Sequence, residues 1–234
     1  MIDWRAKLED FLKRTERGLI VSIQAFKGEP FYGVSYARAF ARAAKIGGAV
    51  GIRTNGVSYI RAIKETVDLP IIGIYKKLYR GFEVYITPTD KEARKVVLAG
   101  ADIVGIDATL RKRPSGTSLE KLIKYIKYEL NTPVLADVST IDEAIQAWKY
   151  GADIVATTLS GYTEYTKHKL NGPDFELIEC IAKNINAPVI AEGRFWTHEE
   201  FRKALELGAH AVVIGTAITR PHLIVRKIVK GCIY

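Results

Sequence analysis

Two short patterns alternate along the chain, and they constrain its fold more than any other feature. Gly-Ala followed by a small apolar run recurs at intervals of roughly 50 residues, and Pro followed by an apolar run falls between the copies. The first pattern starts at Gly48, Gly100, Gly151 and Gly208, and the second at Pro70, Pro133 and Pro188. With the run "GLIVSIQ" from Gly18, they predict eight buried strands.

These strands alternate with amphipathic helix patterns. The strands are predicted to end near Gln24, Arg53, Lys76, Asp107, Asp137, Thr157, Glu192 and Gly215. Three helices are predicted to open with a capping box, at Thr89 with Glu92, Thr140 with Glu143, and Thr197 with Glu200. Apolar strands between helices indicate a parallel sheet covered on both faces, and eight such units favour a closed barrel.

The predicted fold is therefore α/β, a (β/α)₈ TIM barrel that forms a single domain over residues 1–234. A doubly wound open sheet is the alternative. Residues 1–16 carry apolar side chains at helical spacing and predict an extra N-terminal helix that packs outside or beneath the barrel. A chain of 234 residues with 48% hydrophobic content suits one such domain.

Composition and charge limit the cellular location and the kinds of partner that we expect. The charged N-terminus lacks a signal peptide's apolar core and no run approaches the ~18 apolar residues of a membrane span, so a soluble, cytoplasmic protein is expected. The net charge of +9 is spread among acids, which is typical of solvated helix faces, and we expect neither a nucleic-acid nor a membrane partner. A homodimer stays open. Cys180 and Cys232 lack metal-site spacing and are interpreted as packing residues.

Six polar or charged residues stand where apolar strands end: Gln24, Arg53, Lys76, Asp107, Asp137 and Glu192. In parallel barrels, side chains at the carboxyl ends of the strands line the active site. Each residue alone could have a structural role, for example Arg53 pairing with Asp107 or Asp137. Six on one rim favour a functional site.

Lys76 and Glu192 are the candidate acid/base pair. Burial beside Arg53 is predicted to favour the neutral amine of Lys76, and a neutral lysine can act as a base. Glu192 ends a strand four positions away around the ring, which places it on the opposite wall, where it could handle a second proton. A Schiff base on Lys76, as in a lyase, is the alternative chemistry. A catalytically silent barrel that binds RNA through its basic surface is the alternative from another class.

The loops after the last two strands predict a phosphate site. Gly193, Gly215 and Thr216 allow a close approach of the backbone to an anion, and Arg220 adds a charged contact. A metal site is not expected, since the histidines fall in predicted loops, helices or a strand start, away from the acidic strand ends. They are His168, His198, His210 and His222. No cofactor is expected.

Several stretches resemble the bacterial N-acetylmannosamine-6-phosphate 2-epimerase family. They are "SIQAFKGEPF", "GAVGIRTNG", "LPIIGIYK", "VYITPT", "GIDATLRKRP", "LADVST", "TTLSGYTEYT", "PVIAEGR" and "AITRP", in this order from Ser22 to Pro221. "TTLSGYTEYT" is the most specific of them. The chain departs from the family pattern at Ile23 and Lys77-Leu78, and the segment "LYRGF" from Leu78 is atypical.

The resemblance implies a metal-free isomerase that interconverts N-acetylmannosamine 6-phosphate and N-acetylglucosamine 6-phosphate in sialic acid catabolism. It implies that Lys76 moves the proton at carbon 2 and that Glu192 assists at the sugar oxygens. By the same resemblance, the residues that hold the substrate are Gln24, Arg53, Asp107, Asp137 and Arg220, with Arg220 near the phosphate.

Overall fold

The computed structural model describes residues 3–169 and 171–231. Within this part of the chain, eight parallel strands form a closed barrel in which each strand pairs with the next and β8 pairs with β1. The strands are β1 (Leu19–Ile23), β2 (Gly51–Asn55), β3 (Ile71–Ile74), β4 (Ile103–Asp107), β5 (Val134–Asp137), β6 (Ile154–Ala156), β7 (Val189–Glu192) and β8 (Ala211–Ile214). The closed order confirms the predicted (β/α)₈ barrel and excludes the open, doubly wound sheet.

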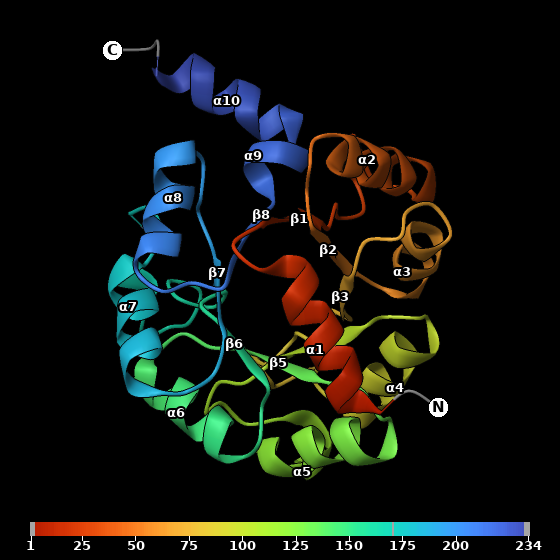
Figure 1. The fold of residues 1–234 in the computed structure, drawn as a ribbon, viewed down its shortest axis with the longest axis vertical. Coiled ribbons are helices and arrows are strands. Elements are labelled where there is room, and N and C mark those ends of the chain that lie inside the picture. Colours follow the sequence, from red (N-terminus) through yellow and green to blue (C-terminus); the bar gives the residue numbers. More distant parts are fainter. Residues whose placement is uncertain (1–2, 170, 232–234) are drawn as a thin grey trace.

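Helices cover the outside of the barrel (Figure 1). The longer ones are α1 (Trp4–Thr15), α2 (Val34–Ile46), α3 (Val57–Lys64), α4 (Asp90–Leu98), α5 (Leu119–Lys124), α6 (Ile141–Lys149), α7 (Phe175–Asn184), α8 (His198–Glu206) and α10 (Pro221–Gly231). Shorter segments are η1 (Pro114–Gly116), the π-helical η2 (Tyr125–Glu129), η3 (Lys167–Lys169) and α9 (Thr216–Thr219).

Two of the three predicted capping boxes are present, at the starts of α6 and α8. The third prediction is wrong in its hydrogen bonds. Helix α4 does begin after Thr89, but the Thr89 hydroxyl donates to the Glu92 carboxylate and accepts no backbone N–H. The Glu92 carboxylate also accepts from Lys77 and Tyr79, at 3.2 and 3.0 Å, so these side chains hold it away from the helix start.

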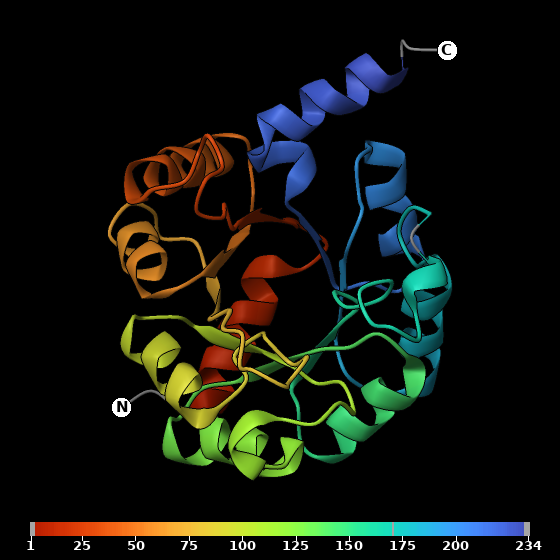
Figure 2. The same ribbon diagram turned by 180° about the vertical axis from the view of Figure 1, so that it is seen from behind.

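The N-terminal helix closes one end of the barrel, as expected of a helix beneath it. In Figure 1, α1 crosses the barrel in front of the strands. Its Phe11 is only 1% exposed and packs on apolar side chains that point inward from the strands, among them Ile20, Ile72 and Ile190. The opposite end of the barrel is the carboxyl end of the strands, which faces the reader in Figure 2.

Helix α10 extends away from the body of the barrel in both views (Figures 1 and 2). Three apolar side chains on it are at least half exposed: Val225 at 58%, Ile228 at 63% and Val229 at 50%. No helix among the described residues has the length and apolarity needed to cross a bilayer. Cys180 is half-buried on α7, whereas Cys232 lies outside the described residues.

Candidate active site

The strand period explains which residues reach the site. Alternate residues of a strand face the same side, and the apolar layer inside the barrel contains Ile72, Ile103, Leu135, Ile154 and Ile190. Two residues further along these strands are Ile74, Gly105, Asp137, Ala156 and Glu192. Four residues further along, three of the strands lead to Lys76, Asp107 and Thr158. On these five strands the alternation therefore turns polar side chains inward at the carboxyl end, where the barrel opens.

A cavity of about 470 Å³ lies at this end, within the size range of small-molecule sites. The predicted site residues that line it are Gln24, Arg53, Lys76, Glu192, Gly193, Gly215, Thr216 and Arg220. Asp107 and Asp137 are fully buried and are not among its lining residues. Lys76 and Glu192, the predicted acid/base pair, come from opposite walls, since β3 and β7 lie four strands apart in the closed barrel.

Arg53 is the centre of a buried ionic network. It does not end its strand, as the sequence suggested, but lies in the middle of β2 with no exposed surface. Its guanidinium donates to both oxygens of Asp137, at 2.8 and 2.7 Å, and to Glu192 Oε2 at 2.7 Å. Burial lowers the pKa of Arg53, but these two carboxylates outweigh burial and raise it. Gly105 leaves room for Ile74, because a Cβ at this position would lie only 2.7 Å from the Ile74 side chain, whereas its distance of 3.7 Å from Arg53 Nη2 is an ordinary contact.

Glu192 ends β7 with a side chain that is 13% exposed. Burial raises the pKa of its carboxyl group, and the charge of Arg53 opposes this rise. Thr157 fixes the backbone of Glu192 on both sides, because its hydroxyl donates to the Glu192 carbonyl and accepts from the Glu192 N–H, each at 3.0 Å. The carboxyl group is thus held in place at the cavity wall.

Lys76 follows β3 by two residues and is partly buried. Its backbone N–H donates to Asn55 Oδ1 at 2.7 Å, and no ion pair joins its ammonium to any carboxylate of residues 3–169 or 171–231. Burial and then the charge of Arg53 lower the pKa of Lys76 to about 8. This confirms the predicted shift towards the neutral amine and its two causes.

The atypical segment after Lys76 forms a loop whose ends are joined. Lys76 pairs with Ile86 in an antiparallel bridge, and the Lys77 N–H donates to the Tyr85 carbonyl at 2.9 Å. The rings of Phe26 and Tyr85 lie 5.0 and 5.9 Å from Lys76 Nζ. Burial raises the pKa of Tyr85 to about 12, so its phenol stays protonated near neutral pH. The bridge thus fixes one wall of the cavity.

The predicted phosphate residues gather at the β7 and β8 side of the cavity. Gly193 has φ 120°, in the region that favours glycine, and α9 begins directly after Gly215. Arg220 is 21% exposed, stacks on Phe26 at 5.0 Å and contacts the Glu29 carboxylate at 3.2 Å. An arginine and a helix start therefore face the same end of the cavity.

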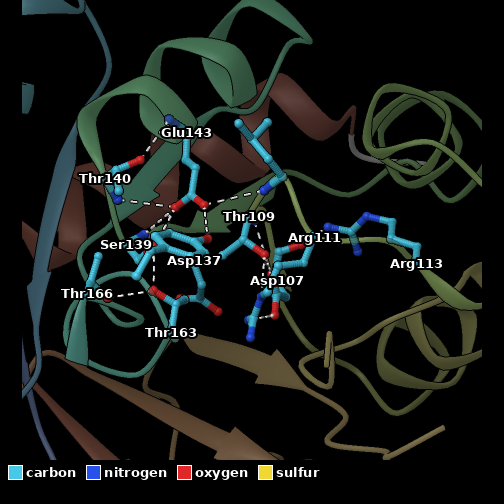
Figure 3. Close-up of polar contacts among 12 residues, drawn as sticks. Asp107, Thr109, Arg111, Arg113, Asp137, Ser139, Thr140, Glu143, Thr163 and Thr166 are labelled. Atoms are coloured by element: carbon cyan, nitrogen blue, oxygen red, sulfur yellow. Dashed lines mark hydrogen bonds and ion pairs between the residues drawn. The ribbon is translucent and has the colours of Figure 1, made fainter. Parts of the chain in front are cut away.

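Asp107 belongs to a neighbouring polar cluster (Figure 3). Its carboxylate accepts from the Thr109 hydroxyl at 2.7 Å and from Arg111 at 2.8 Å, and Arg113 donates to its carbonyl. Burial raises the pKa of Asp107, against the charge of Arg111. Asp107 therefore pairs with Arg111 and not with Arg53, and its contact with substrate stays a prediction.

The described residues contain no group of three or more His, Cys, Asp or Glu side chains that could hold a metal ion. The histidines lie in the kinds of segment that the sequence indicated. His168 lies in η3, His198 in α8 and His222 in α10, and His210 directly precedes β8.

Sequence reasoning missed several residues that line the cavity. Thr158, Tyr85, Phe26 and Arg194 all lie on its wall, although all four belong to stretches that carried the family resemblance. The strand period could have found Thr158, because it lies two residues after inward-facing Ala156. No local pattern marks Phe26, which reaches the cavity from the loop between β1 and α2.

A (β/α)₈ barrel with a small-molecule cavity, a lysine of lowered pKa and a buried carboxyl group on the opposite wall is the architecture of an acid/base enzyme. A profile of the family described as "Putative N-acetylmannosamine-6-phosphate epimerase" matches residues 37–232. The chain therefore belongs to the N-acetylmannosamine-6-phosphate 2-epimerase family and is an isomerase.

Individual relatives agree with this family. The chain is 54% identical to an N-acetylmannosamine-6-phosphate 2-epimerase homologue of Caldanaerobacter subterraneus subsp. tengcongensis, over 94% of this chain and 93% of that protein. It is 49% identical to one of Clostridioides difficile, over 94% and 98%. The solved N-acetylmannosamine-6-phosphate 2-epimerase from Clostridium perfringens superposes with a TM-score of 0.91 at 45% identity, covering 94% of this chain and 95% of that one.

Proposed function

We propose that the enzyme interconverts N-acetylmannosamine 6-phosphate and N-acetylglucosamine 6-phosphate by proton transfer at carbon 2, in amino-sugar and sialic acid catabolism. The observation that carries this proposal is Lys76, an amine without an ion-pair partner in the described chain, with its pKa lowered to about 8, on a cavity wall opposite Glu192. A base of this pKa suits proton abstraction near neutral pH.

The chemistry requires an open sugar. The hydrogen on carbon 2 becomes acidic only when carbon 1 is an aldehyde, so the ring opens first. The Glu192 carboxylate takes the proton from the carbon 1 hydroxyl, the bond between carbon 1 and the ring oxygen breaks, and Glu192 passes the same proton to the ring oxygen. The neutral amine of Lys76 then removes the proton from carbon 2. The resulting ammonium of Lys76 stabilises the enolate, whose negative charge lies on the carbon 1 oxygen. If the intermediate rotates, the same lysine returns the proton to the opposite face.

Gln24 and Arg220 hold the substrate at two ends in this proposal. Gln24 Oε1 is buried at the cavity and has no hydrogen-bond partner among the described residues, so it is free to accept from a sugar hydroxyl or an acetamido N–H. Arg220 and the first N–H groups of α9 bind the phosphate, with Gly193, Gly215 and Thr216 allowing its approach. The phosphate would then replace Glu29 on Arg220.

Arg53 and Asp137 act on the substrate through Glu192. Arg53 lines the cavity, but its Nη1 and Nη2 already donate to two carboxylates, and Asp137 is wholly covered. The buried Nε of Arg53 has no hydrogen-bond partner among the described residues. In this proposal Arg53 orients Glu192 and balances its charge, and Asp137 holds the Arg53 guanidinium in place, instead of the direct substrate contact that the sequence suggested for both.

The reaction is tested by incubating the purified protein with N-acetylmannosamine 6-phosphate and following the two sugar phosphates by proton NMR. We expect an equilibrium mixture that forms without added metal or cofactor. Borohydride reduction in the presence of substrate tests the Schiff-base alternative, since only an imine on Lys76 leaves a mass adduct. No turnover, or a trapped adduct on Lys76, would overturn the proposal.

We also propose a homodimer and a cytoplasmic location. The apolar face of α10 is exposed in the part of the chain that the structure describes, and a second copy would bury it. A charged sugar phosphate is retained inside the cell, which supports the location. Sedimentation at micromolar concentration should give twice the chain mass, and Ile228→Glu should lower that mass. A monomer in both cases would contradict the dimer.

A further inference from the structure

Thr158 occupies a position that the reaction described above does not yet use. Its hydroxyl lies 2.6 Å from Asp137 Oδ1, 3.2 Å from Glu192 Oε2 and 3.3 Å from Arg53 Nη1. It follows β6 by two residues and lines the cavity. One hydroxyl therefore contacts the guanidinium and both of its carboxylate partners.

A hydroxyl has one proton to donate and can accept from another group at the same time. Thr158 can accept from Arg53, but it can donate to only one of Asp137 and Glu192. Asp137 already has two donors from Arg53, at 2.8 and 2.7 Å, whereas the Glu192 carboxylate has one, at 2.7 Å. A hydrogen bond from the Thr158 hydroxyl therefore adds little to Asp137, and it stabilises Glu192 most when Glu192 is ionised.

We propose that Thr158 is a positioning residue that acts as a hydroxyl switch for Glu192. While Glu192 holds a proton, the Thr158 hydroxyl donates to Asp137. When Glu192 gives up its proton, the hydroxyl rotates about its C–O bond and donates to Glu192. No covalent bond of Thr158 breaks, and the moving proton travels only between Glu192 and a sugar oxygen. This inference rests on the proposed role of Glu192.

The surroundings of Glu192 make such a donor effective. The charged groups that face it are Arg53 from β2, Asp137 from β5 and Lys76 from the segment after β3. Two carboxylates share one guanidinium in a largely buried site, so a charge on Glu192 is costly and each hydrogen-bond donor to it matters. The Thr158 hydrogen bond lowers the pKa of Glu192, in the direction that the switch requires.

Thr157 provides a matched control. It is the neighbouring residue, is 2% exposed and also contacts Glu192, but through the backbone and not through the carboxylate. Thr157→Val should lower the thermal stability without moving the ionisation of Glu192. Thr158→Val should move that ionisation, and Thr158→Ser, which keeps the hydroxyl, should restore it.

The test is the pH profile of kcat for the full-length enzyme and the three variants, with thermal unfolding measured in parallel. In Thr158→Val the limb that reports Glu192 should move to higher pH by about one unit, with kcat changed about tenfold where the profiles separate, the weight of one hydrogen bond to a charged group. Thr158→Ser should match the unchanged enzyme.

An unmoved limb in Thr158→Val, or a Thr158→Ser variant as impaired as Thr158→Val, would overturn the switch. Should Thr158→Val not fold, Thr158→Ala under the same assay gives the same two outcomes. Glu192→Gln separates the two claims. Full activity in Glu192→Gln would contradict the role of Glu192 itself, whereas an inactive Glu192→Gln beside an unmoved Thr158→Val limb would contradict the switch alone.

Discussion

Two dense polar clusters lie side by side at the carboxyl end of this barrel, and they differ in how completely their charged groups are paired. Around Glu143, groups of the protein itself supply the hydrogen bonds to the carboxylate. Its carboxylate accepts from Ser139, Thr140 and Tyr165 and so joins the loops after β5 and β6 (Figure 3). Around Lys76, a cation without an ion-pair partner in the described chain faces a cavity. We call the first the loop cluster and the second the cavity cluster.

The comparison shows why charged residues at strand ends do not all mark chemistry. Asp107 ends β4 much as Glu192 ends β7, but Arg111 and Thr109 satisfy the Asp107 carboxylate locally. Glu192 depends on groups that also serve Asp137, and it borders open space. Incomplete satisfaction next to a cavity, more than charge alone, separates the site from the structural network.

Replacing the unpaired lysine should have the largest effect. Lys76→Ala is expected to lower kcat by roughly 10²- to 10⁴-fold, because it removes the base from carbon 2. Lys77→Ala is the matched control, since Lys77 pairs with Glu92 away from the cavity, and it should retain kcat within about threefold. Steady-state kinetics at saturating substrate gives the comparison. Equal losses in the two variants would contradict the role of Lys76 in the cavity cluster.

The next largest effect concerns stability. Arg53→Met leaves Asp137 and Glu192 without their common counter-charge, and we expect the free energy of unfolding to fall by about 3–5 kcal/mol. Arg111→Met leaves Asp107 with two donors from Thr109 and should cost less, about 1–3 kcal/mol. Urea unfolding at neutral pH measures both. A smaller cost for Arg53 would contradict its central place in the cavity cluster.

The pH dependence of the unchanged enzyme sharpens the contrast further. Only neutral Lys76 accepts a proton, so kcat/KM should rise about tenfold per pH unit below a pKa of about 8 and level off above it. The lowered pKa also affects stability. The unfolded chain binds more protons than the folded one between about 8 and the ordinary lysine value, so this residue makes stability rise with pH there. A flat rate profile between pH 6 and 9 would contradict the lowered pKa.

The smallest effect should come from the loop cluster. Tyr165→Phe removes one donor from Glu143, which keeps its bonds to Ser139 and Thr140. We expect a loss of about 1 kcal/mol in the free energy of unfolding and little change in kcat. Thermal unfolding and initial rates measure the two quantities. A large loss of kcat with stability intact would move this cluster into the reaction.

Much of the fold could be predicted because the repeats are local and regular. Alternating strand and helix signals predict the order of the elements, and eight parallel strands covered by helices favour a closed barrel. The bonds of Thr89 could not be predicted, because they depend on where Lys77 and Tyr79 reach in three dimensions.

The candidate site, like the fold, could be predicted only where a local pattern in the sequence indicates it. Strand ends identified Lys76 and Glu192, since polar residues after apolar runs are visible in one sequence. The sequence did not show which carboxylates pair with Arg53, because Asp137 lies 84 residues and Glu192 lies 139 residues from it along the chain. Phe26 and Tyr85 come from loops, where no periodicity indicates direction.

The central claim, that Lys76 exchanges the proton at carbon 2, is tested most directly by running the reaction in heavy water and analysing the product by NMR. The account predicts deuterium at carbon 2 of the product, and loss of both exchange and epimerisation in Lys76→Ala with the fold retained. A product that keeps its original hydrogen at carbon 2, or undiminished exchange in Lys76→Ala, would contradict it.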